Sequence, residues 1–241
     1  MRHLLTTVAL VTALAAGCGD DTGAAIDAAA DDAAVDAAID APPGPCGAGL
    51  QLTGEYIDWD STPAAFDGVE DAIWRVVAPP GGAMATTAPN GRIILCITRA
   101  ATSEIDVQQA AYVRATFLAD PAVFSPPGSS FTARGLKSAV ADAQLAEFGE
   151  TFDETRAHVL VYKIGAPIPL TLGPATTPPQ RSFVSGGNAD ITWTAGATGA
   201  LTLFPNRPVG GGTATLTSTA MFTGPTTLPL TAGRFTITVI R

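Results

Sequence analysis

The sequence is poor in the side chains that most catalytic and metal sites use. It has two histidines and three cysteines in 241 residues, and aromatic residues make up 7%. His3 lies near the N-terminus, so histidine-dependent chemistry would rest on His158 alone, and no nucleophile motif accompanies His158. A Cys-x-x-Cys pair is also lacking, which argues against a zinc or redox site. We therefore expect a protein that is not an enzyme and holds no cofactor, with a hydrolase using His158 as a remote alternative.

Basic residues are scarce too. The chain has 13 Lys and Arg and 22 Asp and Glu, which gives a formal net charge of −9. We therefore expect no nucleic-acid partner. Residues 55–154 hold fourteen acids and six bases, whereas residues 156–241 hold Asp190 alone and six bases. Such halves would attract each other, and we favour that interpretation; the alternative is that the second half faces an anionic surface such as lipopolysaccharide.

The N-terminus has the features of a signal segment. Arg2 and His3 precede the apolar stretch 4–16, which is too short to cross a bilayer. It ends in Leu14-Ala15-Ala16-Gly17-Cys18, which resembles the lipobox of bacterial lipoproteins. The resemblance implies that residues 1–18 are a lipoprotein signal peptide with a lipidated Cys18. It also implies an exported protein anchored in the membrane, at the outer membrane or the periplasmic face. Ordinary cleavage with free secretion is the alternative.

Residues 19–45 have the composition of a tether. This segment carries seven aspartates, no Lys or Arg, and otherwise mostly Ala. Aspartate disfavours helix interiors and the carboxylates repel one another, so we expect an extended, disordered chain. A flexible segment of this length spans on the order of 30 Å. The run Pro42-Pro43-Gly44-Pro45 marks its end.

The two remaining cysteines, Cys46 and Cys96, form an even pair in an exported chain. We expect a disulfide between them, which would close a loop of about 50 residues and contribute about 3 to 4 kcal/mol.

The composition of residues 46–241 predicts a mainly β fold. Glycine, proline and threonine are frequent, and short apolar alternations recur. The clearest is 234–240, where Phe235, Ile237 and Val239 share one face and threonines the other, as in a half-buried strand. Further strands are predicted at 50–59, 72–77, 91–97, 111–118, 158–162, 191–194, 200–204 and 213–217. One short helix is predicted between Gly135 and Gly149.

Two stretches share a pattern. Gly68-Val69-Glu70-Asp71-Ala72 followed by residues 86–95, and Gly165-Ala166-Pro167-Ile168-Pro169-Leu170 followed by residues 198–210, each suggest a strand, a glycine turn and a returning strand. Both resemble carboxypeptidase regulatory-like (prealbumin-like) domains. The resemblance implies two immunoglobulin-like β-sandwich units, 46–155 with a helix near 135–149, and 156–241. Such domains usually serve as scaffolds, adhesion spacers or carbohydrate-binding accessories.

Candidate ligand-binding residues cluster after the first predicted strand. Trp59, flanked by Asp58 and Asp60, is the best candidate for an exposed indole that packs on sugar rings, although tryptophans in sandwiches are more often core residues. Asp67, Glu70 and Asp71 are weak calcium candidates, because oxygen ligands could converge there; their spacing fits no calcium-loop motif, and a solvated strand end is the favoured interpretation.

Taken together, these features predict a membrane-anchored exported lipoprotein that acts as a non-catalytic binding or structural module. A carbohydrate-binding accessory protein for cell wall or polysaccharide is the alternative. The expected partners are the membrane, through the lipid, and a glycan or a cell-surface protein.

Overall fold

A computed structural model describes residues 46–241 apart from 63, 127–128, 176–180 and 187–191. Pro43–Arg241 form one compact unit. The signal peptide, Cys18 and nearly all of the tether lie outside the described residues, so these predictions stay predictions. The described residues form no helix that is long and apolar enough to span a membrane.

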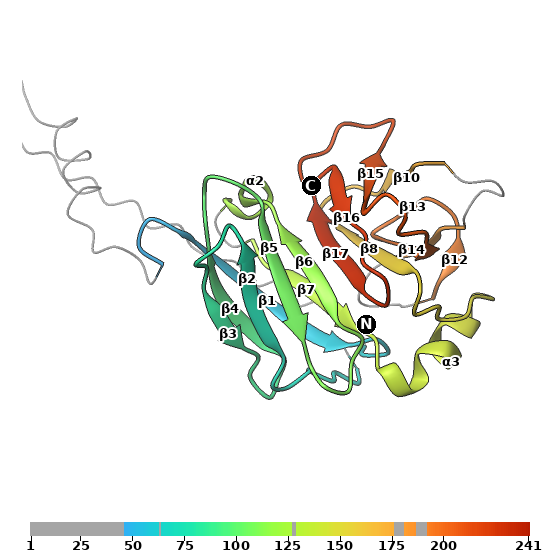
Figure 1. The fold of residues 1–241 in the computed structure, drawn as a ribbon, viewed down its shortest axis with the longest axis horizontal. Coiled ribbons are helices and arrows are strands. Elements are labelled where there is room, and N and C mark those ends of the chain that lie inside the picture. Colours follow the sequence, from blue (N-terminus) through green and yellow to red (C-terminus); the bar gives the residue numbers. More distant parts are fainter. Residues whose placement is uncertain (1–45, 63, 127–128, 176–180, 187–191) are drawn as a thin grey trace, which may run out of the picture. The chain divides into compact units, whose positions relative to one another are not determined.

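The main sheet has nine strands in the order β12-β11-β14-β8-β17-β6-β5-β2-β3. Figure 1 shows β17 between β6 and β8. In chain order the strands are β2 (Ile73–Ala78), β3 (Met84–Thr86), β5 (Ser103–Gln108), β6 (Ala115–Ala119), β8 (Ala157–Lys163), β11 (Phe183–Ser185), β12 (Thr194–Ala195), β14 (Leu201–Arg207) and β17 (Phe235–Ile240).

Strand β17 joins the two halves of the chain. It pairs in parallel with β6 on one side and with β8 on the other. All six of its residues are buried, including Thr236 and Thr238, so the prediction of a half-buried strand with threonines facing solvent is wrong. A strand that is covered on both faces buries its polar side chains as well, and a buried hydroxyl without a hydrogen bond is unfavourable. The hydroxyl of Thr236 donates a hydrogen bond to the carbonyl oxygen of Pro229.

A three-stranded sheet covers one face of the main sheet. Its order is β4-β1-β7, formed by β1 (Leu50–Asp58), β4 (Arg92–Ile97) and β7 (Phe131–Gly135). The large core between these sheets is rich in aromatic rings, and at its centre Trp74 contacts Tyr56, Phe117 and Phe131 with ring centroids 5.3–5.7 Å apart. The predicted disulfide Cys46–Cys96 is confirmed, and it ties the start of the described chain to β4.

A second three-stranded sheet packs on the opposite face of the main sheet, where it covers β6, β17, β8 and β14. It is formed by β10 (Thr171–Gly173), β15 (Thr213–Thr217) and β16 (Thr227–Pro229). Its inward leucines meet Val159, Phe204 and Ile240 in a smaller core. A further two-stranded ladder joins β9 (Ile168–Pro169) to β13 (Thr198–Gly199).

Helical structure is limited. The helix predicted between Gly135 and Gly149 is present as the 3-10 turn η1 (Ser138–Val140) and α3 (Ala141–Ala146), and a short helix, α2 (Pro121–Phe124), follows β6. The mainly β prediction is confirmed. The two-unit sandwich is not, because strands from 46–155 and 156–241 share one continuous sheet. Arg234 of the second half pairs with Asp106 of the first, as the charge distribution along the chain favours.

Part of the main sheet is open on one face. The second small sheet covers β6, β17, β8 and β14, whereas β2 and β3 keep exposed side chains on that side, among them Ile73, Val77 and Met84. We call this surface, formed by the outward side chains of β5, β2 and β3, the open face. It lies next to the β6 edge of the covered region.

Candidate binding site on the open face

The open face follows from strand alternation. In β2, Trp74 and Val76 point into the core, so Ile73 and Arg75 point outward. Arg75 lies opposite Met84 of β3 and Asp106 of β5 in the sheet register. The side chain of Ile73 is 40% exposed, and that of Met84 61%. Aliphatic and charged groups therefore alternate on a surface that no described element covers.

Asp106 is the centre of a polar cluster on this face. Its carboxylate accepts hydrogen bonds from Nε and Nη2 of Arg114 at 2.8 and 2.6 Å, from Nη1 of Arg234 at 3.0 Å, and from Gln108. Burial raises the pKa of Asp106, but hydrogen bonds from Arg114 and Gln108 and the charges of both arginines outweigh it and lower the pKa below its ordinary value. The cluster therefore holds Arg114 in a fixed position as a charged group.

A pocket of about 500 Å³ lies at the end of the open face, beside the Asp106 cluster. It lies where β2 begins and where β5 turns into β6. Its lining consists of polar and small apolar groups from these two segments: Asp71, Ile73, Gln108, Gln109, Ala110 and Arg114. The volume falls in the range of small-ligand sites.

Asp71 enters the pocket from a left-handed backbone position. Its φ is 57°, a region that aspartate and asparagine tolerate better than most residues. The segment is fixed by Thr87, whose hydroxyl accepts from the backbone N–H of Ala72 at 2.8 Å and donates to the carbonyl oxygen of Val69 at 2.6 Å. The first glycine pattern has two parts, Gly68–Ala72 and the turn before β4, and these two segments contact each other. Gly91 has a φ of 73° in that turn.

The prediction that Trp59 is exposed is wrong. Its side chain is 2% exposed, and its ring stacks on Trp193 at 5.5 Å and contacts Phe235 at 5.9 Å. The reason lies in the loop after β1, where Nη1 of the buried Arg134 donates to the carbonyl oxygens of Asp58, Trp59 and Ser61 and turns the chain inward. Trp74 is also buried, so these two indoles offer no platform to a sugar ring.

The acidic candidates do not converge on one site, although Asp58 and Asp67 share a partner. Asp58 is buried and pairs with Lys137 at 2.9 Å, and Asp67 lies 3.7 Å from the same amine. Asp60 accepts from Gln144. Glu70 is exposed, while Asp71 lines the pocket. Among the described residues, no three His, Cys, Asp or Glu side chains are grouped so that they could hold a metal ion. Ligand binding by Asp58, Trp59 or Asp60 stays a prediction.

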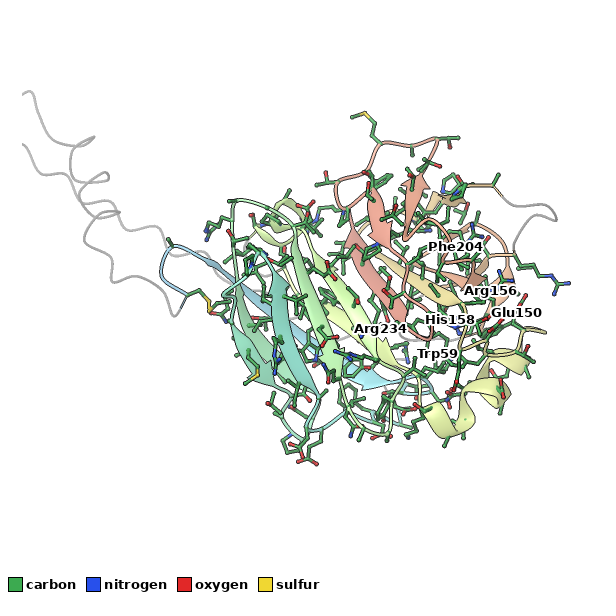
Figure 2. The ribbon with its side chains drawn as sticks, viewed as in Figure 1. Trp59, Glu150, Arg156, His158, Phe204 and Arg234 are labelled. Carbon is green, nitrogen blue, oxygen red and sulfur yellow. A yellow bond between two sulfur atoms is a disulfide. The ribbon has the colours of Figure 1, made fainter. Side chains whose placement is uncertain are left out.

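His158 lies inside the aromatic core and away from this pocket. Its imidazole, fully buried, is stacked between Phe152 at 4.5 Å and Phe235 at 5.1 Å, and Nδ1 accepts from the backbone N–H of Asn206 at 3.3 Å. Figure 2 labels His158 and Trp59, whose rings both contact Phe235. Burial lowers the pKa of His158 to about 4. A hydrogen bond to the Asp153 backbone and the charge of Asp153 raise the pKa, but they do not outweigh burial.

This burial predicts a loss of stability in mild acid. The folded state keeps His158 neutral down to about pH 4, whereas an unfolded histidine takes up a proton near pH 6.5. The unfolded state therefore binds more protons, and we expect the free energy of unfolding to fall by about 3 kcal/mol from pH 7.5 to pH 4. Urea unfolding at several pH values measures this. The variant His158→Gln should flatten the slope between pH 6.5 and 4.5, and an unchanged slope would contradict the assignment.

No protein-family model matches the chain, and no curated protein matches it, so membership in the carboxypeptidase regulatory-like family is not confirmed. Among solved structures, the chain is similar to the Bacillus anthracis TIE protein, with 8% identity and a TM-score of 0.29, over 81% of this chain and 34% of that one. It is also similar to a Streptococcal ancillary pilin, with 10% identity and a TM-score of 0.24, over 80% of this chain and 62% of that one. The chain thus spans about a third and about three fifths of their lengths, and these scores carry no functional argument.

Proposed function

We propose that this protein is an exported, membrane-tethered lipoprotein whose folded unit is a non-catalytic binding module. The observation that carries the proposal is the open face, where Ile73, Val77 and Met84 are exposed on a sheet surface that no described element covers, and where Ile73 helps to line a pocket. Ligand sites are commonly concave and combine apolar walls with a few fixed polar groups.

The tether supports the same proposal. The disulfide fixes Cys46 to β4 directly after the aspartate-rich segment, so the folded unit begins at a covalently secured point. Disulfides persist in oxidising compartments, which fits export. Lipidation of Cys18 would then hold the module at a membrane surface, with the tether giving it reach.

The absence of catalysis is part of the proposal. His158 is enclosed by Phe152 and Phe235 and accepts a backbone hydrogen bond at Nδ1. A general base has to reach the proton it removes, so this placement supports a structural role for the ring. A purely structural spacer is the second candidate, and the large, continuous main sheet favours it.

Detergent phase separation of the full chain and of the variant Cys18→Ala tests the proposal, because it reports attached acyl chains and not binding to the cell envelope. We expect the unaltered protein in the detergent phase and Cys18→Ala in the aqueous phase. The variant should still bind sedimented cell-envelope fragments through the open face. Partition of Cys18→Ala into the detergent phase like the unaltered protein would contradict lipid tethering. Failure of the variant to bind would favour the spacer.

A further inference from the structure

The hydrogen-bonding groups of the pocket are balanced between donors and acceptors. Gln108 uses Nε2 on Asp106, which leaves Oε1 as an acceptor. Gln109 accepts from the backbone N–H of Ala111 at 2.6 Å through Oε1, which leaves Nε2 as a donor. Arg114 uses Nε and Nη2 on Asp106, so Nη1 is the nitrogen available to a ligand. The carboxylate of Asp71 adds acceptors, and the lining therefore offers both kinds of partner.

The charge of the lining is balanced as well. Asp71 and Arg114 are the charged side chains of the pocket, and they have opposite signs. The guanidinium of Arg114 is already paired with Asp106 at 2.6 Å. Asp71 would repel a strongly anionic ligand, and Arg114 would repel a cationic one. The lining thus selects a neutral ligand that both donates and accepts hydrogen bonds.

Two of the groups are positioned before any ligand arrives. Arg114 is held by two hydrogen bonds to one carboxylate, and Gln109 lies in a turn closed by a hydrogen bond from the N–H of Tyr112 to the carbonyl oxygen of Gln109 at 3.0 Å. The backbone next to Asp71 is held by the hydrogen bonds of the Thr87 hydroxyl to Ala72 and Val69. Ile73, 40% exposed, adds an aliphatic wall. Prior ordering of this kind reduces the entropy that binding costs.

We propose that the Asp71–Gln109–Arg114 pocket binds a neutral saccharide unit. Each sugar hydroxyl is at once a donor and an acceptor, so adjacent hydroxyls match the carboxylate, the amides and the guanidinium of this lining. The C–H groups of a pyranose ring pack on Ile73 and Ala110. The inference rests on the proposed binding function and gives its ligand class, and it moves the saccharide site from Trp59 to the turn between β5 and β6.

Amide chemical-shift mapping tests the proposal. The full chain carrying Cys18→Ala, labelled with ¹⁵N, is titrated with methyl α-glucopyranoside, methyl β-galactopyranoside, N-acetylglucosamine and cellobiose. Parallel titrations use glucuronic acid and a casein peptide digest. We expect saturable shifts at Gln108, Gln109 and Ala110 with at least one neutral sugar. Shifts at these residues only with glucuronic acid, or only with peptides, would overturn the inference.

Three variants make the test specific. Asp71→Asn keeps a residue that tolerates the left-handed backbone but loses a charged acceptor, and Gln109→Ala loses a donor. Each should weaken sugar binding about tenfold, which corresponds to one hydrogen bond of ~1.4 kcal/mol. Glu55→Gln, at an exposed position of β1 in the other sheet and outside the pocket lining, should leave binding unchanged. Equal effects of all three variants would overturn the inference.

The outcomes separate this inference from the proposed function. If no probe shifts these amides while Cys18→Ala still binds envelope fragments, the saccharide inference fails and the binding module stands. If the envelope fragments are not bound either, both fail.

Discussion

Replacing Trp59 with alanine should destabilise the protein by about 3 to 5 kcal/mol, the usual cost of removing a buried tryptophan. Its ring stacks on Trp193 at 5.5 Å and contacts Phe235, which belongs to the central strand β17. The loss would open a cavity between the main sheet and the loop after β1. Urea unfolding of the full chain measures the change.

The variant Trp59→Phe keeps a ring and most of the buried area, so its loss should be clearly smaller than that of Trp59→Ala. A ligand-binding indole would behave differently. Trp59→Ala would then leave the urea midpoint nearly unchanged and reduce ligand binding, and that result would contradict the buried position of Trp59.

Removing the disulfide is expected to cost about 3 to 4 kcal/mol of stability, because the bond restricts the unfolded chain across a sequence separation of 50 residues. The double variant Cys46→Ser/Cys96→Ser, or reduction of the unaltered protein, measures the loss in urea. Both should give the same midpoint. The variant Cys18→Ala is the matched control, because Cys18 lies outside the disulfide, and it should unfold like the unaltered chain.

A different result would change the account of the fold. If the double variant kept the stability of the unaltered protein, β1 and β4 would be held by their antiparallel ladder alone. The disulfide would then add no stability at the point where the tether enters the folded unit.

Strands with apolar alternation were predictable from the sequence, and less regular ones were not. The segments 50–59, 91–97 and 213–217 correspond closely to β1, β4 and β15. Strand β5 also alternates, with Ile105 and Val107 between Glu104, Asp106 and Gln108, but it was missed because these are its only two large apolar residues. Strand β7 was missed because it holds Arg134, a charge whose burial depends on carbonyl partners far away in sequence.

The sharing of one sheet by both halves was also beyond sequence reasoning. The pairing of β17 with β6 joins residues about 120 positions apart, and no local pattern records it. The same applies to Trp59, since its flanking aspartates suggested exposure while Arg134 draws the loop inward.

The candidate pocket was predictable in part. Asp71 was singled out as an oxygen ligand, and it does line the pocket. Gln108, Gln109 and Arg114 were not, because their importance depends on the β5–β6 hairpin that brings them opposite the start of β2. The available signal was the turn Gln109-Ala110-Ala111 between two short alternating stretches.

The measurement that tests the central claim most directly compares two exposed isoleucines. Ile73 on the open face is 40% exposed, and Ile94 on β4, in the other sheet, is 47% exposed. In the Cys18→Ala chain, Ile73→Lys should weaken binding to cell-envelope fragments about tenfold or more, while Ile94→Lys should leave it within about twofold. Equal losses from the two substitutions, or a larger loss from Ile94→Lys, would contradict binding through the open face.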